Sequence, residues 1–419
     1  MMREAKSSGI AWIGTIPKCW ETDKLKYHLR RNEPRNPGDV VVLSLYRELG
    51  VIPKDSRDDN HNVTSEDTSK YKYVRPGDFV INKMKAWQGS VAVSEYEGIV
   101  SPAYFVYEFT DDTIFKRYFH YLLRSCYKDE FMRLSGGIRV GQWDLPADAL
   151  GNTPILIPPM DEQCRIADFL DTKCAEIDAL TADIQTQIDT LEQYKRSVIT
   201  ETVTKGLNPD AEMKDSGIQW IGDMPAHWDV IRGKYILRYM QKPVREDDGV
   251  ITCFRDGEVT LRSNRREDGF TMSDKEIGYQ GIDVGDLVVH GMDGFAGSIG
   301  ISDSRGKASP VLNVLDTDQC KRYIMYYLRS MAYSDVFLAL ATGIRVRSCD
   351  LRWNKLAELS YPVPPLDEQN AIVKHIDSVL SKADAVIADK KAQLATLDEY
   401  KKSLTFEYVT GKKEVPCID

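Results

Sequence analysis

A single long duplication constrains the architecture of this 419-residue chain more than any other feature of its sequence. The segment S-G-I-A-W-I-G at 8–14 returns as S-G-I-Q-W-I-G at 216–222, an offset of 208. Further along, the offset settles at 206, and P-P-M-D-E-Q at 158–163 returns as P-P-L-D-E-Q at 364–369. One tandem repeat of this length predicts two similar globular parts, because a solenoid needs three or more short units.

Each copy divides into a globular part and a helical part. The globular part mixes short alternating strands, such as 78–81 and 286–289, with turns rich in Gly, Pro and Asn. After Pro-Pro, each copy runs for more than 40 residues without Gly or Pro. We therefore expect an α+β fold with globular α/β domains at 1–155 and 207–362, long helices at 156–206 and 363–412, and a tail at 413–419.

The two helical segments carry apolar residues at a seven-residue step, which is the pattern of a coiled coil. The first seam consists of Leu170, Ile177, Ile184, Leu191 and Val198. The second copy has two seams, interrupted by Lys390 and Lys401: Ile376, Ala383, Leu397 and Leu404, and Val373, Leu380, Ile387 and Leu394. We expect the helices to pair antiparallel in a cyclic, pseudo-twofold arrangement. The alternative is that each helix packs only on its own globular part.

The composition is that of a folded protein, with 42% hydrophobic and 28% charged residues and a net charge of −9. No apolar run is long enough to span a membrane, and the N-terminus lacks the apolar core of a signal peptide. The eight cysteines form no C-x-x-C pair, so we expect reduced thiols in a cytosolic protein. Neither a phosphate-binding G-x-x-x-x-G-K-[ST] loop nor a metal-ligand spacing of histidines is present, so we expect no nucleotide-binding loop and no metal site in this chain.

The paired motifs resemble the specificity (S) subunits of type I restriction–modification enzymes. The resemblance rests on two copies of S-G-I-x-W-I-G-x-x-P-x-x-W, each followed by P-P-hydrophobic-D-E-Q and a long heptad helix. It covers nearly the whole chain. It implies that each globular part is a target recognition domain reading one half of a split, asymmetric DNA site. It also implies that the helices set the spacing and carry methyltransferase (M) subunits.

The resemblance further implies partners that do the chemistry. Two methyltransferase subunits and, in the full complex, restriction or translocase (R) subunits would bind this chain and double-stranded DNA. S-adenosylmethionine, ATP and Mg²⁺ are expected on those subunits, and no cofactor is expected on this chain. The location implied is the prokaryotic cytoplasm, at the nucleoid.

Arginines that both halves share are predicted to contact phosphates, because a shared position cannot encode two different half-sites. These are Arg139 and Arg345, each in G-I-R-V, together with Arg47 and Arg255. The alternative is that they form structural ion pairs.

Residues that differ between the halves are predicted to read bases. In the first half these are Lys83, Lys85, Trp87 and Gln88, since glutamine pairs with adenine and lysine with guanine. Core packing is the alternative for Trp87. In the second half the predicted residues are Arg262, Asn264, Arg265 and Arg266, because arginine is the commonest guanine reader.

The first helical segment concentrates acid, with 10 acidic and 5 basic residues in 156–206. Its outward carboxylates are predicted to receive the methyltransferase subunits: Glu176, Asp183 and Glu192. A solvated helix face explains the same charges equally well. Two other functions stay open from the residues alone: an adaptor whose globular ends bind proteins and not DNA, and a stand-alone nuclease.

Overall fold

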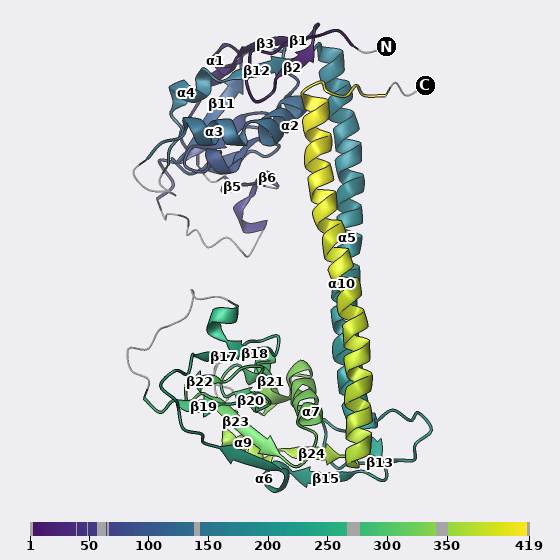
Figure 1. Ribbon diagram of the computed structural model, residues 1–419. Coiled ribbons are helices and arrows are strands. Elements are labelled where there is room, and N and C mark those ends of the chain that lie inside the picture. Colours follow the sequence, from purple (N-terminus) through teal and green to yellow (C-terminus); the bar gives the residue numbers. More distant parts are fainter. Residues whose placement is uncertain are drawn as a thin grey trace. The chain divides into compact units, whose positions relative to one another are not determined.

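The computed structural model describes residues 3–38, 40–47, 49–56, 64, 67–137, 143–265, 277–340 and 351–416. It divides into two compact units, one of 1–184 with 392–419 and one of 185–391. Each unit contains one globular part and a portion of both long helices, α5 (Met160–Lys205) and α10 (Leu366–Val409) (Figure 1). The units therefore cut through both helices, whereas the sequence-based division gives each helix a segment of its own. The predicted segment boundaries stay a prediction.

The first globular part is built on a four-stranded antiparallel sheet. Its strand order is β4 (Leu29–Arg31), β11 (Tyr104–Phe109), β8 (Phe79–Asn82) and β9 (Val91–Val93). Smaller antiparallel pairs surround it: β1 (Ala5–Ser7) with β2 (Thr15–Pro17), β3 (Glu21–Lys24) with β12 (Pro154–Ile157), β5 (Leu43–Tyr46) with β6 (Gly50–Pro53), and β7 (Lys72–Val74) with β10 (Gly98–Val100). The helices are α1 (Leu25–His28), α2 (Lys116–Cys126), α3 (Lys128–Leu134) and α4 (Ala147–Gly151), with short 3₁₀ turns η1 (Lys54–Ser56) and η2 (Ala86–Gln88).

The second globular part repeats this plan. Its sheet has the order β16 (Leu237–Met240), β23 (Leu312–Thr317), β20 (Leu287–His290) and β21 (Ile299–Ile301). Its smaller pairs are β13 (Met213–Asp215) with β14 (Asp223–Pro225), β15 (Asp229–Arg232) with β24 (Ser360–Val363), β17 (Ile251–Cys253) with β18 (Val259–Leu261), and β19 (Gln280–Ile282) with β22 (Gly306–Ala308). Its helices are α6 (Gly233–Ile236), α7 (Lys321–Tyr333), α8 (Val336–Ala339) and α9 (Trp353–Glu358), with η3 (Arg262–Asn264) and η4 (Gly294–Ala296). The α+β class and the duplication are confirmed.

One helix covers the central sheet in each globular part. In α2 the buried residues Tyr118, Phe119, Leu122, Leu123 and Cys126 recur every three or four positions, which gives the helix one apolar face. That face joins a core with the sheet residues Phe79, Ile81 and Phe105. The helix α7 packs in the same way on the second sheet.

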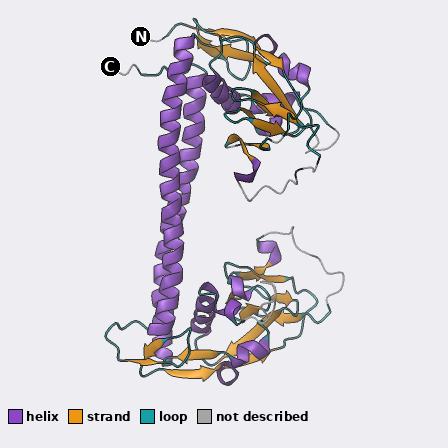
Figure 2. Cartoon of the chain, turned by 180° about the vertical axis from the view of Figure 1, so that it is seen from behind, coloured by secondary structure: helices purple, strands orange, loops and turns teal. Residues whose placement is uncertain are grey.

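The long helices pair antiparallel within each unit, as the heptad seams predict, and both views show them side by side (Figures 1 and 2). In the first unit the Phe169 and Tyr408 rings lie 4.4 Å apart, and Asp178 pairs with Lys401 at 2.5 Å. In the second unit Lys195 pairs with Asp384 at 2.6 Å. As the residue number rises along one helix, its partner's number falls along the other.

The ends of the long helices also pack in the globular cores. Each helix therefore packs both on the other helix and on a globular part, which combines the two alternatives. Ile166, Ala167 and Leu170 of α5 and Leu404 and Tyr408 of α10 belong to the buried core of the first unit. The two interrupting lysines do not break the helix pair, because each spans the seam to bond the other helix. Lys401 pairs with Asp178, and Lys390 Nζ donates to Gln187 Oε1.

No helix in the described part of the chain is long and apolar enough to cross a membrane. The six cysteines that lie in the described part are free thiols.

Candidate nucleic-acid interface

The glutamine of the repeated P-P-x-D-E-Q motif fastens the start of each long helix to its globular part. Gln163 Oε1 accepts a hydrogen bond from the Phe115 N–H at 2.7 Å, just before α2 begins. Its Nε2 donates to the carbonyl of the first proline of the motif at 2.8 Å. Gln369 makes the same two bonds, to the Cys320 N–H and to the first proline of its motif, both at 2.9 Å. Both glutamines are at most 1% exposed, so the motif is part of the scaffold.

A buried tyrosine fastens the opposite end of the partner helix to the same globular part. Tyr118 Oη donates to the Val409 carbonyl at 2.9 Å, at the C-terminus of α10. Tyr323 Oη donates to the Val203 carbonyl at 3.0 Å, near the C-terminus of α5. The last carbonyls of a helix have no partner within it, so these bonds satisfy them. Each globular part thus holds the beginning of one helix and the end of the other.

The second tryptophan of the repeated S-G-I-x-W-I-G-x-x-P-x-x-W motif packs on the glycine that ends the partner helix. Gly206 and Gly411 follow α5 and α10 with φ of 75° and 69°, the left-handed conformation typical of a helix C-terminus. A Cβ on Gly411 would lie 3.0 Å from the Trp20 ring, and one on Gly206 would lie 3.1 Å from the Trp228 ring. The two shared motifs therefore meet at each junction and leave little room for a side chain.

The two junctions differ in how they hold the motif glutamate. In the first unit Trp20 Nε1 donates to Glu162 Oε2 at 2.9 Å. In the second unit Glu368 Oε2 instead lies 2.8 Å from His227 Nε2. The Trp228 indole N–H is buried and has no partner among the described residues. The two junctions therefore have the same geometry but differ in the hydrogen bonds of the motif glutamate.

The shared arginines that the structure describes lie against the loops that differ between the halves. Arg47 Nη2 donates to Gln88 Oε1, so a predicted phosphate contact touches a predicted base reader. Arg255 pairs with Asp293 at 3.1 Å, in the corresponding loop of the second half. Both arginines are exposed. Two further predicted phosphate contacts lie outside the described residues: Arg139 and Arg345.

The predicted base readers of the first half stand on and beside η2. Lys83 pairs with Asp144 at 2.8 Å, and Lys85 is exposed. Trp87 is half-buried, and its ring centre lies 5.5 Å from that of Trp143. The structure therefore gives Trp87 a packing role and leaves part of its surface accessible.

The predicted base readers of the second half gather at η3. Arg265 pairs with Asp256 at 2.6 Å and with Glu258 at 3.1 Å, and its guanidinium lies 4.2 Å from the Phe254 ring centre. Asn264 Nδ2 donates to a threonine hydroxyl at 2.9 Å, and Arg262 is half-buried. A base contact by Arg265 would have to replace its two carboxylate bonds. Arg266 lies outside the described residues.

The sequence did not predict the cationic cluster around Phe105. Only one of its members, Lys83, is among the predicted base readers. The Arg31 guanidinium lies 4.3 Å from the ring centre, and Lys72 and Lys83 Nζ lie 5.4 and 5.8 Å from it. Glu33 bonds both Arg31 and Lys72, at 2.8 and 2.9 Å. Burial lowers the pKa of Lys72, although the bond to Glu33 opposes this shift.

The corresponding place in the second half carries uncharged side chains. At an offset of 208, Tyr239, Gln280 and Asn313 take the positions of Arg31, Lys72 and Phe105. Gln280 is buried, and its Oε1 has no partner among the described residues. The sequence does show that these three positions differ between the halves. However, residues 31, 72 and 105 are far apart along the chain, so the sequence does not show that they form one cluster.

The predicted docking carboxylates of α5 are exposed or partly exposed. Glu176 pairs with Lys173 at 2.7 Å, and Glu192 pairs with Lys195 at 2.9 Å. Because Lys195 also bonds Asp384 of α10, Glu192 is tied to the helix pair. Asp183 is exposed.

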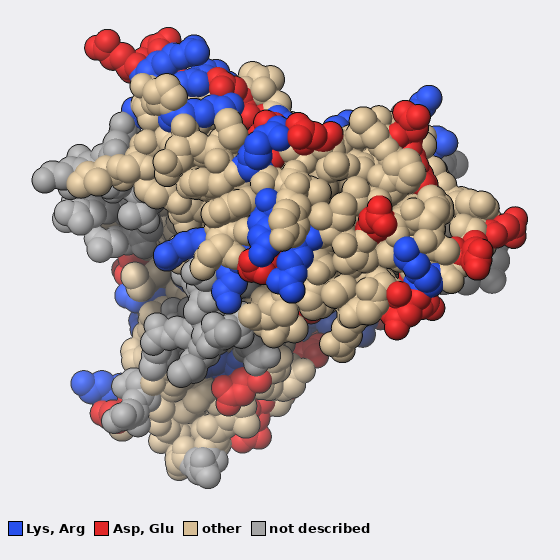
Figure 3. All heavy atoms as spheres, turned by 90° about the horizontal axis from the view of Figure 1, so that it is seen from below, with Lys and Arg blue, Asp and Glu red and all other residues tan. Residues whose placement is uncertain are grey.

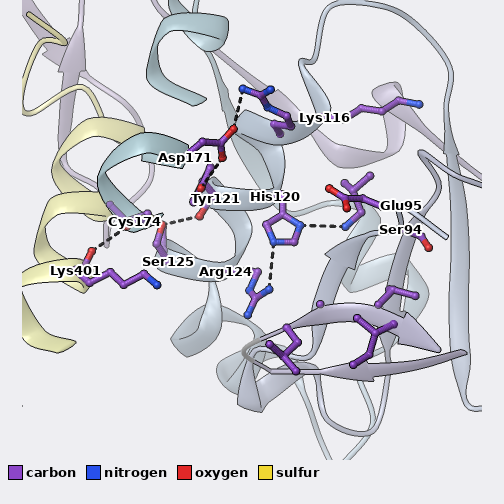
Figure 4. A pocket seen from close by; sticks show the side chains of 18 of the residues that line it. Ser94, Glu95, Lys116, His120, Tyr121, Arg124, Ser125, Asp171, Cys174 and Lys401 are labelled. Atoms are coloured by element: carbon purple, nitrogen blue, oxygen red, sulfur yellow. Dashed lines mark hydrogen bonds and ion pairs between the residues drawn. The ribbon is translucent and has the colours of Figure 1, made fainter. Parts of the chain in front are cut away.

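A hollow of about 1130 Å³ lies in the first unit between α2 and the helix pair. Figure 4 shows His120 at its centre, with Nδ1 3.3 Å from the Val93 nitrogen and Nε2 3.1 Å from Arg124 Nη1. Burial, reinforced by the Arg124 charge, lowers the pKa of His120 to about 4. Charges of both signs line the hollow, including Lys401 and Asp171, so its chemistry favours no single class of ligand.

Residues 28–190 match the family model of the type I restriction modification DNA specificity domain. Two proteins of Methanocaldococcus jannaschii resemble nearly the whole chain. One, assigned as the specificity subunit of the type I restriction enzyme MjaX, is 24% identical over 96% of both chains. The other is the MjaVIII specificity subunit, 23% identical over 96% of this chain and 95% of its own length. Over nearly its whole length the chain is similar to type I restriction–modification specificity subunits.

Solved structures share the fold of this chain. One, from a study of complex assembly and conformational transition of the type I R-M system, has a TM-score of 0.67 at 16% identity and covers 95% of this chain and 99% of its own. The HsdS subunit from Thermoanaerobacter tengcongensis has a TM-score of 0.50 at 16% identity, covering 95% and 98%. The family-model match and the two relatives do not favour the adaptor alternative. A specificity subunit is not catalytic by itself.

Proposed function

We propose that this chain gives a type I restriction–modification complex its DNA sequence specificity, with each globular part reading one half of a bipartite, asymmetric site. The observation that carries the proposal is the specificity-domain match over 28–190, which covers most of the first globular part. The second globular part repeats the same strand order and the same helix junctions. One scaffold therefore presents two sets of reading residues.

The division between shared and differing residues supports this function. The shared residues at the junctions are buried and hydrogen-bonded, as scaffold residues should be. The differing residues at η2 and η3 are exposed or half-buried and carry amide and guanidinium groups. Amides and guanidiniums are the groups that read base edges in the major groove. The Phe105 cluster adds cations beside η2 in the first half.

The paired helices would set the distance between the two half-sites and receive methyltransferase subunits, one for each half. Restriction subunits would join the same complex. S-adenosylmethionine, ATP and Mg²⁺ would be bound by those subunits, which would methylate adenine or cut DNA. The complex would act on DNA in the cytoplasm, at the nucleoid.

Selection from random DNA tests the proposal directly. The chain, purified together with the methyltransferase subunit of the same genome, should enrich two short fixed sequences separated by a gap of constant length. Enrichment of one continuous motif, or of no motif, would contradict it. A mixture lacking this chain is the matched control and should select nothing.

A further inference from the structure

Both globular parts carry a similar heptapeptide whose basic and tyrosine side chains lie on the surface. K-L-K-Y-H-L-R at 24–30 corresponds to R-G-K-Y-I-L-R at 232–238, at the offset of 208. The segments form α1 with β4 and α6 with β16. Both tyrosines are strongly exposed, Tyr27 by 59% and Tyr235 by 75%. An aromatic side chain kept in both copies and left in solvent calls for an explanation outside the globular core.

No role within the described structure accounts for the two tyrosines. Neither hydroxyl makes a hydrogen bond within the part of the chain that the structure describes. Each ring contacts the lysine before it, with Lys26 and Lys234 Nζ lying 5.4 and 5.5 Å from the ring centres. The rings are thus held in place and presented to solvent.

The polar contacts around the tyrosines are duplicated as well. Lys26 Nζ donates to Asn152 Oδ1 at 2.9 Å, and Lys234 Nζ donates to Glu358 Oε1, the equivalent residue, at 3.2 Å. A second pair of contacts repeats in the same way: Arg30 bonds Glu108 at 2.6 Å, and Arg238 bonds Asp316 at 2.9 Å. The two halves therefore preserve a whole surface and not an isolated residue.

These contacts favour a protein over DNA as the occupant. In the second half the cations Arg232, Lys234 and Arg238 are bonded by as many carboxylates: Glu358, Asp316 and Asp318. Phosphate binding depends on uncompensated cations, which the surface of the second half does not offer. In the first half Arg30 pairs with Glu108, whereas Lys26 bonds the uncharged Asn152. Tyrosine and arginine, by contrast, are enriched in the energetic centres of protein interfaces.

The setting of this surface agrees with a protein interface. Figure 3 looks onto the side of α6 and β15, where a compact group of basic side chains, with acidic ones among them, stands on a largely uncharged face. The strands next to α1 and α6 are β3 and β15, and they pair with the strands that lead into α5 and α10. In the second half the candidate base readers follow β18, which belongs to a different sheet from β16, whereas in the first half Lys83 follows β8 of the sheet that contains β4. The surface therefore adjoins the helix junctions.

We propose that Tyr27 and Tyr235, with the lysine and arginine beside each, form two equivalent docking surfaces for the methyltransferase subunit, one copy on each half. The inference rests on the proposed function, which requires a partner bound once per half. The complementary surface on that partner would hold an apolar recess for the tyrosine ring. It would also offer oxygen acceptors to the arginine.

The test measures how many methyltransferase subunits the full-length chain binds, by native mass spectrometry and titration calorimetry. Tyr27→Ala and Tyr235→Ala should each weaken one of two binding events at least tenfold, and the double variant should weaken both. Tyr27→Phe should bind as the wild type does, because the ring is retained. Tyr96→Ala is the matched control, since Tyr96 is 42% exposed and its counterpart at 304 is a serine.

A photo-crosslinker at position 27 or 235 should label the methyltransferase subunit, whereas one at position 96 should not. The inference is overturned if the double variant still binds two subunits with wild-type affinity. It is also overturned if that variant loses DNA affinity and keeps subunit binding, because the surface would then face DNA. A wild-type chain that binds no methyltransferase subunit at all would overturn the proposed function itself.

Discussion

Gln163 and Gln369 show how a short motif can serve the fold at the level of single hydrogen bonds. Each side chain joins the start of a long helix to backbone atoms about 50 residues away in sequence. A buried polar group that loses such a partner destabilises the fold by its full desolvation free energy. The motif therefore marks a joint between two parts of the molecule and carries no chemistry of its own.

Replacing one of these glutamines should destabilise the chain without changing the DNA sequence that is read. We expect Gln163→Ala to lower the free energy of unfolding by about 1–3 kcal/mol, because the Phe115 N–H and two carbonyls lose their partner. Urea unfolding followed by circular dichroism measures this change. Gln185→Ala is the control, since among the described residues the Gln185 side chain makes one hydrogen bond, to Asp189, on the exposed surface. Equal stability of the two variants would contradict the role assigned to Gln163.

Acid should weaken the second unit through Asp283. Bonds from Lys242 and Arg305 hold the pKa of Asp283 at about 2, below its ordinary value. Because folding lowers the pKa of Asp283, its carboxylate stabilises the folded state at any pH above the ordinary pKa of an aspartate. This stabilisation disappears as the pH falls toward about 2. Asp283→Asn should therefore flatten the loss of stability between pH 5 and about pH 2. The exposed Asp247→Asn should leave that slope as in the wild type, and a slope unchanged by Asp283→Asn would argue against this role.

Alanine variants of Arg265 and Arg255 should distinguish base reading from phosphate binding. Arg265→Ala should change the preferred bases of one half-site by about 1–3 kcal/mol and leave the other half-site unchanged. Arg255→Ala should weaken binding to all sequences about equally and reduce the salt slope by about one unit. Binding measured at several salt concentrations on a panel of altered sites distinguishes these outcomes. A change of consensus in Arg255→Ala alone would reverse the assignment.

At the scale of elements, the sequence predicted the helices well and the site only in part. The seven-residue step predicted two long helices, which the structure shows at Met160–Lys205 and Leu366–Val409, because periodic burial is a local property of the chain. It could not predict that Lys401 would bond Asp178 across the seam, since this depends on the register between two helices. The Phe105 cluster was missed because its cations come from 31, 72 and 83, and only the folded sheet brings them together.

The helix pair offers a test of how the half-site spacing is set. Inserting four residues near Thr186 adds about one turn, or about 6 Å, and keeps the seam roughly facing inward. Because DNA rises about 3.4 Å per base pair, the gap between half-sites should lengthen by one or two base pairs. The half-site sequences should not change, and the methylated motif of a strain carrying the insertion reports both. An unchanged gap with intact activity would mean that the helices do not set the spacing.

At the scale of the whole molecule, duplication assigns two kinds of task to one chain. Equivalent residues hold the helix junctions in both halves, as Tyr118 and Tyr323 do. Residues that differ surround η2 and η3, and we predict that these residues read two different half-sites. The sequence exposed this division because the two copies can be compared with each other, position by position. The mechanical role of each shared residue became clear only from its partners in the fold.

The most direct test of the central claim is the adenine methylation pattern of the host genome, sequenced with and without this gene. The account predicts one bipartite, asymmetric motif with a constant gap that is methylated in the parent, lost on deletion and restored when the gene is returned. Returning a chain whose second globular part comes from another specificity subunit should change one half of the motif only. A methylation pattern that stays the same after deletion would contradict the assignment of sequence specificity to this chain.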